Sequence, residues 1–590
     1  MLKCEMDIQI AGRSRIIGIE AAGQFAFFAM QVIPLVLLAK YFAPVGNGSG
    51  PWESSFAQAA YQHWLQWILL VPLVGAFLAD VLLGKRVCLL VSCVLCALGL
   101  GLLACTGQFP QPHLTFLVGL VLVALGFAGI KPCTLALLGD QASIGGSEWV
   151  SRAYHQLYFF AQVACCASLW MTPKMLENHG SQWSLVLPCL LLCLALAYFL
   201  LGWRRFKSLP TTDSGFFREI FSLSFIAKCL RCAPVIVCLV FFWAFSSHIE
   251  TAWLRQAQQT NLKWIGFGHL PLQIGAIKPW LVICLIPALS LGIYPLLEKR
   301  RPIFPLWKMV CGMFLLAGAL ALMPILNRSL DADQFPAPWM QWLVIALLAA
   351  AEVMVVITAL AWLYRNAPAS MKSCAMALAI ASIWAGDQFL LSIQKAMTVP
   401  SAAAQQWAAA HQAMPLAWQK SPRSVVLPGY SDDPQDDIIA RGKNGVIHQL
   451  DIPGNSIYQE ATNRIDAISR GGFPSNKNGQ IMINELRDLW GNPLIYQRVH
   501  RDQAKIFSAG PDRQMGTQWD LGLVLNRKQV RWNAISAQPD AQITHQPISG
   551  GGGKQLLDMN EDRFLTIFLA AFAFVFLAYT QIFRSRLSQG

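Results

Sequence analysis

The chain has 590 residues, of which 55% are hydrophobic and only 13% are charged, against about 25% charged residues in ordinary soluble domains. This composition excludes a string of soluble domains and indicates a protein that crosses a membrane several times. The formal net charge of +13 does not indicate a nucleic-acid partner, because the basic residues cluster between apolar runs, as the positive-inside rule describes.

Apolar runs of the length that a membrane-spanning helix needs, about 20 residues, recur along the chain. They predict twelve helices, near residues 16–41, 57–83, 87–106, 113–138, 153–173, 183–203, 231–253, 277–297, 304–326, 338–363, 372–397 and 564–583. The first run has no small-residue cleavage site, so we expect it to be an uncleaved helix.

Lysine and arginine predict the orientation of these helices. The loops 42–56, 107–112 and 327–337 have almost none, whereas the opposite loops and the two termini carry small basic clusters. We therefore expect both termini to be cytoplasmic and the protein to lie in a bacterial inner (plasma) membrane. The basic clusters comprise Arg13, Arg15, Lys85, Arg86, Arg204, Arg205, Lys207, Lys299, Arg300, Arg301, Arg365, Lys372, Arg584 and Arg586.

A basic stretch divides the predicted helices into two groups of six, the layout of the major facilitator superfamily. The predicted fold is an all-α membrane protein of twelve helices (6+6) with an α+β extracytoplasmic domain inserted between helices 11 and 12. The expected parts are an N-terminal bundle at 1–205, a cytoplasmic linker at 206–230, helices 7–11 at 231–398, the inserted domain at 399–563, and helix 12 with a cytoplasmic tail at 564–590.

A charged turn follows the second predicted helix. It contains Gly75, Asp80, Gly84, Lys85 and Arg86. The tight turn, the acid and the basic pair resemble the loop motif of the major facilitator superfamily. An acid at this place can cap a helix N-terminus and pair with bases across the interface between the bundles.

The fourth predicted helix reads Gly126-Phe-Ala-Gly129-Ile-Lys131-Pro, with Gly139-Asp-Gln after it. This resembles the signature of the proton-dependent oligopeptide transporter family. Further matching blocks extend the resemblance over 1–398 and the last helix. They lie at 157–162, 242–257, 278–299 and 364–373.

The resemblance implies import of di- and tripeptides by proton symport. Lys131 would receive the peptide carboxylate and Glu352 the peptide amine. A zwitterion needs opposite charges at opposite ends of a low-dielectric cavity, and an ionisable residue inside an apolar segment is otherwise costly. The other predicted substrate-binding residues are Tyr158, Gln162, Gln24, Phe27, Phe28 and Trp384.

The first and seventh predicted helices depart from the family pattern. Gly23 and Gln24 stand where the family has glutamate and arginine, Phe27 and Phe28 replace two tyrosines, and Ser247 replaces an acid. We expect a cavity with one positive and one negative group.

Proton coupling should therefore be weak or rerouted, with the proton as the one possible coupling ion and no other cofactor. The candidate sites are Glu20, His248 and Glu250, since histidine titrates near neutral pH. The alternative interpretation places His248 and Glu250 at the outer mouth of the pore, without a role in coupling.

The polar stretch at 399–563 is long enough to bury a core of its own. Its segment 485–521 resembles the C-terminal region of type II secretion major pseudopilins, with strands predicted at 494–496 and 504–507. Calcium binding is not favoured, because Asp512 and Asp520 are the two obvious ligands and calcium takes six or more oxygens.

Two functions remain open. The first is a secondary transporter of small peptides or related zwitterions. The second is a transport-deficient receptor or assembly component whose periplasmic domain binds an envelope protein. An enzyme is not favoured, because the sequence shows no Ser-His-Asp order, HExxH motif or P-loop.

Overall fold

The computed structural model describes most of the predicted helical part and short pieces of the polar stretch. The described residues are 2–31, 33–34, 37, 61, 63–203, 206, 222–259, 275–300, 304–331, 338–397, 413–415, 438–442, 447–450, 460–461, 464–465, 473–487, 492–500, 503–508, 521–526, 544–549 and 561–588. The prediction that Asp512 and Asp520 bind no calcium falls outside these residues.

The N-terminal half is helical, and three of its described glycines have positive φ, Gly84 (φ 77°), Gly146 (φ 93°) and Gly180 (φ 81°). Gly84 ends the charged turn and Gly180 kinks a 54-residue helix, conformations that glycine adopts without strain. The elements are α1 (Leu2–Met30), α4 (Val71–Phe77), η1 (Leu78–Leu83), α5 (Lys85–Ala104), η2 (Thr106–Gln108), α6 (Pro112–Ala142), η3 (Ser143–Gly145) and α7 (Ser147–Leu200).

The C-terminal half contains two π-helical turns, η6 and η7, inside otherwise α-helical segments. The last helix, α20, packs against α13 and α9 and so completes this half from the far end of the chain. The elements are α9 (Leu223–Gln259), α11 (Ile277–Pro287), η6 (Ala288–Ile293), α12 (Tyr294–Glu298), α13 (Pro305–Asp331), α14 (Pro338–Glu352), η7 (Val353–Ile357), α15 (Thr358–Asn366), η8 (Ala369–Met371), α16 (Lys372–Met397) and α20 (Glu561–Ser588).

In the described part of the chain, ten helices are long and apolar enough to cross a membrane. Helices suit this role because each satisfies its own backbone hydrogen bonds without water. The prediction of a multi-pass, mostly helical membrane protein is therefore confirmed. The first helix begins earlier than predicted, at Leu2 instead of residue 16.

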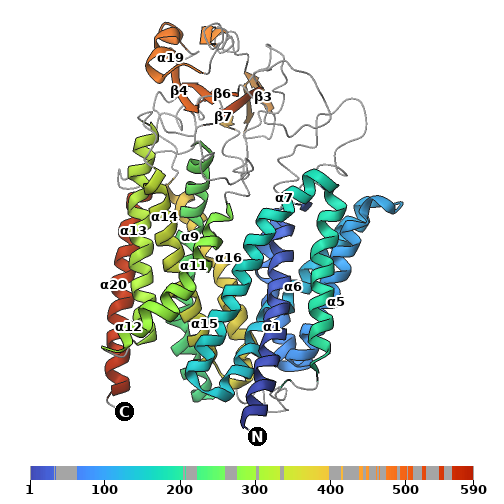
Figure 1. Ribbon diagram of the computed structural model, residues 1–590. Helices are drawn as coiled ribbons and strands as arrows, with labels where there is room; N and C mark the ends of the chain where they lie inside the picture. Colours follow the sequence, from blue (N-terminus) through green and yellow to red (C-terminus); the bar gives the residue numbers. More distant parts are fainter. Residues whose placement is uncertain are drawn as a thin grey trace.

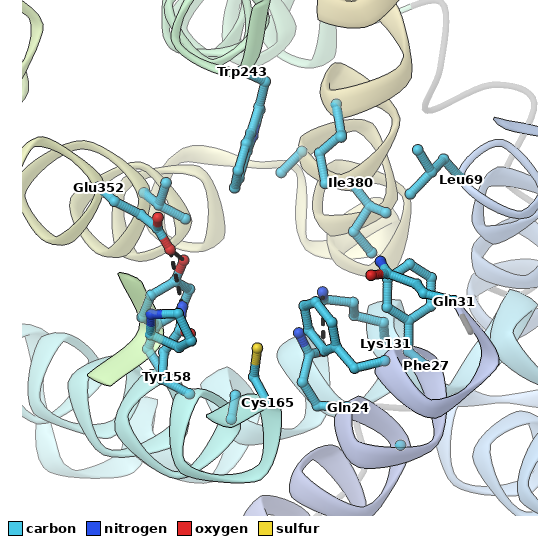
Figure 2. A pocket seen from close by; sticks show the side chains of 18 of the residues that line it. Gln24, Phe27, Gln31, Leu69, Lys131, Tyr158, Cys165, Trp243, Glu352 and Ile380 are labelled. Atoms are coloured by element: carbon cyan, nitrogen blue, oxygen red, sulfur yellow. Dashed lines mark hydrogen bonds between the residues drawn. The ribbon is translucent and has the colours of Figure 1, made fainter. Parts of the chain in front are cut away.

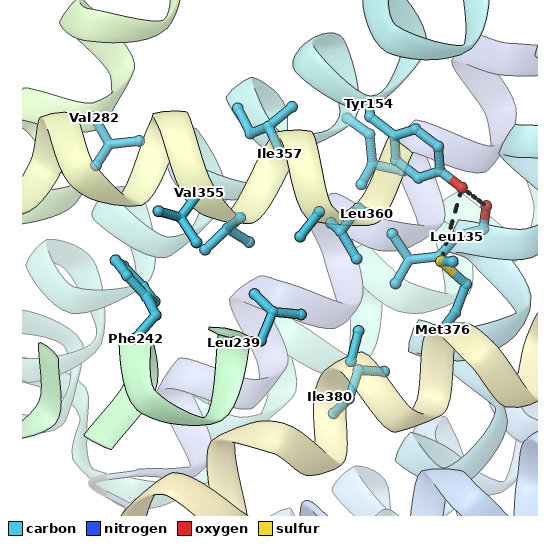
Figure 3. Close-up of a cluster of buried hydrophobic side chains, with 14 of the residues drawn as sticks. Leu135, Tyr154, Leu239, Phe242, Val282, Val355, Ile357, Leu360, Met376 and Ile380 are labelled. Atoms are coloured by element: carbon cyan, nitrogen blue, oxygen red, sulfur yellow. Dashed lines mark hydrogen bonds between the residues drawn. The ribbon is translucent and has the colours of Figure 1, made fainter. Parts of the chain in front are cut away.

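The two halves meet through apolar side chains (Figure 3). α16 packs against α9 of its own half and against α4 and α6 of the other. Tyr154 of α7 is fully buried, donates a hydrogen bond of 2.9 Å to the Leu135 carbonyl and lies against Met376 of α16. The core thus continues across the interface between the bundles.

Polar contacts also join the halves, at the end of the molecule where both termini lie (Figure 1). Asp80 accepts a hydrogen bond of 3.0 Å from the backbone N–H of Cys374 in the first turn of α16, where a negative charge is stabilised. Asp140 accepts from Tyr364 Oη at 2.7 Å and pairs with Lys85 Nζ at 2.8 Å. The charged turn of the sequence therefore contacts the opposite bundle through Asp80, while Lys85 is held within its own bundle and Arg86 is partly buried beside it.

The described strands form two antiparallel sheets at the opposite end from the termini (Figure 1). One has the order β1-β2-β3 and the other β4-β5-β6-β7. The two predicted strands are confirmed, somewhat longer, as β4 and β5. The bounds are β1 (Ala413–Pro415), β2 (Ile438–Gly442), β3 (Ile447–Leu450), α19 (Asn476–Ile483), β4 (Ile495–His500), β5 (Gln503–Ser508), β6 (Leu521–Asn526) and β7 (Thr544–Ser549).

A small core of its own joins α19 to the second sheet. Ile483, Leu494, Tyr496 and Ile506 are buried in it. Gly479 of α19 lies so close to the Tyr496 ring that a Cβ there would come within 2.1 Å of it. This packing is separate from the core of the helical bundles.

Candidate functional site

A cavity of about 640 Å³ lies between the two halves (Figure 2). Its walls come from α1, residues 65–69, α4, α6 and α7 on one side and from α9, α11, α14, η7, α15 and α16 on the other. Apolar and aromatic side chains make up most of the lining, with a few polar groups, as in small-molecule sites generally. The polar and charged lining residues are Glu20, Gln24, Gln31, Gln66, Lys131, Tyr158, Gln162, Ser247, Glu250, Lys278, Glu352 and Asp387.

Lys131 is the positive group of the N-terminal wall. Its Nζ lies 3.4 Å from Gln24 Oε1, a neutral partner, as Figure 2 shows. Glu20 also lines this wall, accepts a hydrogen bond from Thr134 one turn along α6, and interacts electrostatically with Lys131. Glu20, a candidate for proton coupling, therefore lies on the same wall as Lys131.

α1 approaches α6 closely at Gly23, the position where the family pattern has an acid. A Cβ on Gly23 would lie 3.1 Å from Ile130 Cγ2, closer than ordinary contact. A larger residue would require the Ile130 side chain to give way by a few tenths of an ångström. The carboxylate on this wall is accordingly one helical turn away, at Glu20.

Glu352 lies on the opposite wall and is 2% exposed. Its Oε1 accepts hydrogen bonds from Tyr158 Oη and from Gln162 Nε2, the latter at 2.9 Å, and both donors belong to α7 of the other half. Glu352 is the last residue of α14, immediately before the π-helical turn η7. Such turns re-aim side chains and are frequent at functional sites.

Lys278 of α11 connects two acids of the same wall. Its Nζ lies 2.7 Å from Glu352 Oε2 and also pairs with Glu250 of α9. The prediction of one positive and one negative group is therefore wrong, because the cavity carries two lysines and four carboxylates, those of Glu20, Glu250, Glu352 and Asp387. Glu250 lines the cavity and pairs with Lys278, and its side chain is 41% exposed, so its position at the mouth of the pore stays a prediction.

Some of the remaining predicted residues line the cavity, and others do not. Phe27 and Phe28 line the cavity and meet edge to face, with ring centroids 5.6 Å apart. Trp384 is not among the lining residues, because Ile383 and Asp387, four residues apart, occupy the cavity side of α16. His248 is 8% exposed and does not line the cavity either.

Two charged residues of the site were not assigned from the sequence. Lys278 belongs to the matching block 278–299, which gives it no role, and Asp387 lies outside the matching blocks. Both stand inside predicted membrane segments, and an ionisable residue there indicates a functional site by itself. That signal could have identified both residues.

Curated relatives resemble the chain at low identity. Peptide transporter family 2 of Caenorhabditis elegans is 25% identical over 343 residues, which are 48% of this chain and 42% of the relative. Solute carrier family 15 member 2 of Rattus norvegicus is 25% identical over 388 residues, 58% of this chain and 52% of the relative. The chain thus spans about half the length of the curated relatives it matches. These relatives are transporters by name, which agrees with the prediction that the chain is not an enzyme.

Solved structures show the same fold. The crystal structure of an auto-inhibited POT family peptide transporter matches with a TM-score of 0.50 and 21% identity over 68% of this chain and 91% of that chain. The in meso crystal structure of the POT family transporter PepTSo matches with a TM-score of 0.51 and 20% identity over 68% and 92%. The sequence model of the POT family matches residues 86–233 and 226–409. Because the residues that this family model matches make up more than half of the chain, the protein belongs to the POT family, the proton-dependent oligopeptide transporters that its motifs predict.

Proposed function

We propose that this protein is a secondary transporter that imports di- and tripeptides, or related small zwitterions, by alternating access with altered proton coupling. The observation that carries the proposal is the cavity between the halves, with Lys131 on one wall and the Glu352 group on the other. The peptide carboxylate would bind Lys131 and the ammonium group would bind the acidic wall. The low dielectric of such a cavity strengthens both interactions.

Contacts at one end of the bundles support alternating access. Asp80 and Asp140 of the N-terminal half bind α16 and Tyr364 of the C-terminal half, at the end where the termini lie. Figure 1 shows the two halves farther apart toward the strands. We propose that twelve helices make up the transporter, with α7 contributing two of them on either side of Gly180. The cavity would then open away from the termini in this conformation.

We further propose that the termini are cytoplasmic and that the polar stretch at 399–563 lies in the periplasm. In intact spheroplasts, a cysteine introduced as Ser475→Cys should react with an impermeant thiol reagent above the background of the unaltered protein. Ser475 begins α19, at the end opposite the termini. As a control, Ser143→Cys in the exposed turn η3 at the terminal end should react only after lysis. The reverse pattern would invert the topology.

Uptake of a labelled dipeptide by proteoliposomes that contain the full chain tests the transport function. We expect uptake that depends little on an imposed pH gradient, because Gly23, Gln24 and Ser247 replace the ionisable residues of the family pattern. Loss of those groups leaves Glu20 as the one carboxylate among the described residues of the N-terminal wall that interacts with Lys131 and could titrate in their place.

Strong acid-stimulated uptake that an uncoupler removes would contradict weak coupling. If this uptake disappeared in Glu20→Gln or His248→Ala, the replaced residue would be the rerouted proton site. Peptide binding without any uptake would instead favour the receptor function.

A further inference from the structure

The carboxylate of Glu352, which the family resemblance assigns to the peptide amine, is already engaged in this protein. Its side chain is 3% exposed, one oxygen accepts from Tyr158 and Gln162, and the other lies 2.7 Å from Lys278. A substrate ammonium group could reach it only by displacing Lys278. The acidic wall therefore needs another carboxylate for direct contact with a cation.

Asp387 is such a carboxylate. It lines the cavity from α16, and its hydrogen-bonding neighbour is the neutral hydroxyl of Ser247 on α9. Within the described part of the chain, no lysine or arginine forms an ion pair with Asp387. Its charged neighbour is Glu250, which repels it.

The charges of the two walls differ in balance. The N-terminal wall has one ammonium group and one carboxylate, those of Lys131 and Glu20. The C-terminal wall has Lys278 against three carboxylates, those of Glu250, Glu352 and Asp387. A cation in the cavity is therefore attracted toward the C-terminal wall, where Asp387 is the carboxylate that Lys278 does not hold.

An aromatic ring completes the subsite. Trp243 and Ser247 lie four residues apart on α9 and both line the cavity, so they share one face of the helix. α16 packs closely against this face, because a Cβ on Gly386 would lie 3.2 Å from Trp243 Cβ and 2.6 Å from the Val240 carbonyl. Asp387 follows Gly386 in the chain and lines the same cavity as Trp243, whose ring projects into it in Figure 2. An indole face beside a carboxylate is a favourable place for an organic ammonium group.

We propose that Asp387, with Ser247 and Trp243, forms the subsite that binds the ammonium group of the substrate. This proposal rests on the proposed function as a peptide transporter. It names Asp387 as the residue that gives the protein a preference for peptides with a free amino terminus. Lys278 keeps Glu352 and Glu250 paired, and Asp387 makes the direct contact. The carboxylate that the family pattern places at position 247 is thus replaced by one that faces it from α16.

Binding of two peptides to the purified full chain tests this subsite. Calorimetry would compare Ala-Ala with N-acetyl-Ala-Ala, which lacks the ammonium group. The unaltered protein should bind Ala-Ala roughly 10- to 100-fold more tightly, as for one charge-assisted contact. In Asp387→Asn the two affinities should lie within about threefold of each other, because Asn keeps the shape and loses the charge. Asp387→Glu should restore part of the preference.

A matched control removes a carboxylate that belongs to the same C-terminal half but does not line the cavity. Glu298→Gln, in the exposed pair with Lys308, should leave the preference unchanged. An unchanged preference in Asp387→Asn would overturn the subsite. Failure of the unaltered protein to bind any peptide would overturn the proposed function, and the subsite with it. Peptide binding by the unaltered protein together with an unchanged preference in Asp387→Asn would overturn the subsite alone.

Discussion

Replacement of Lys131 by alanine is expected to abolish dipeptide binding in the micromolar range, with a loss of about 30-fold or more in affinity. Lys131 is the positive group of the N-terminal wall, and its hydrogen-bonding partner there is the neutral Gln24. Removing one charge of a desolvated pair costs roughly 2–5 kcal/mol. Calorimetric titration of the purified variant with Ala-Ala measures the loss.

A second lysine outside the cavity provides the control for this result. Lys174 lies on α7, stacks over the Trp170 ring at 3.7 Å and does not line the cavity. Lys174→Ala should bind Ala-Ala as the unaltered protein does. Near-normal binding by Lys131→Ala would contradict a cavity built for a zwitterion.

Replacement of Lys278 by methionine is expected to destabilise the protein by roughly 3–5 kcal/mol, because it leaves Glu352 buried without its cation. The side chains of Lys278 and Glu352 are 14% and 3% exposed, so water does not compensate for the loss. Thermal unfolding of the detergent-solubilised variant, followed by circular dichroism, should show a lower melting temperature.

Two further variants separate this effect from a general loss of charge. Lys308→Met removes the partner of Glu298 in a more exposed pair, where the expected effect is below about 1 kcal/mol. Adding Glu352→Gln to Lys278→Met should recover most of the stability, since the buried charge is then gone. Equal melting temperatures for Lys278→Met and Lys308→Met would show that the bridge does not contribute to stability.

The sequence predicted the helices and the two charged positions that the family motif names. The helices were predictable because backbone N–H and C=O groups in a bilayer have no water to bind and must hydrogen-bond within the chain. A long apolar run therefore forms a helix. Lys131 and Glu352 were predictable because burying a charged side chain in an apolar membrane segment is energetically unfavourable. Such a residue therefore indicates a functional site. Both line one cavity, as the predicted roles require.

The partners of these charges depended on the tertiary structure. Lys278 joins Glu250 and Glu352 across three helices, and no spacing along the chain shows that these three side chains meet. Once Lys278 is placed, Glu352 is no longer open to a substrate as the motif alone implies.

The rotation of each helix was also not predictable. Trp384 and Asp387 stand in the same apolar segment, and about 100° per residue separates successive side chains around a helix. Packing of Gly386 against the backbone of α9 turns Asp387 toward the cavity, so that Trp384 does not line it. The sequence by itself thus determined that the protein is a multi-pass helical membrane protein and to which family it belongs. Only the tertiary structure decided which charges face one another, because helix rotation is set by packing against neighbouring helices.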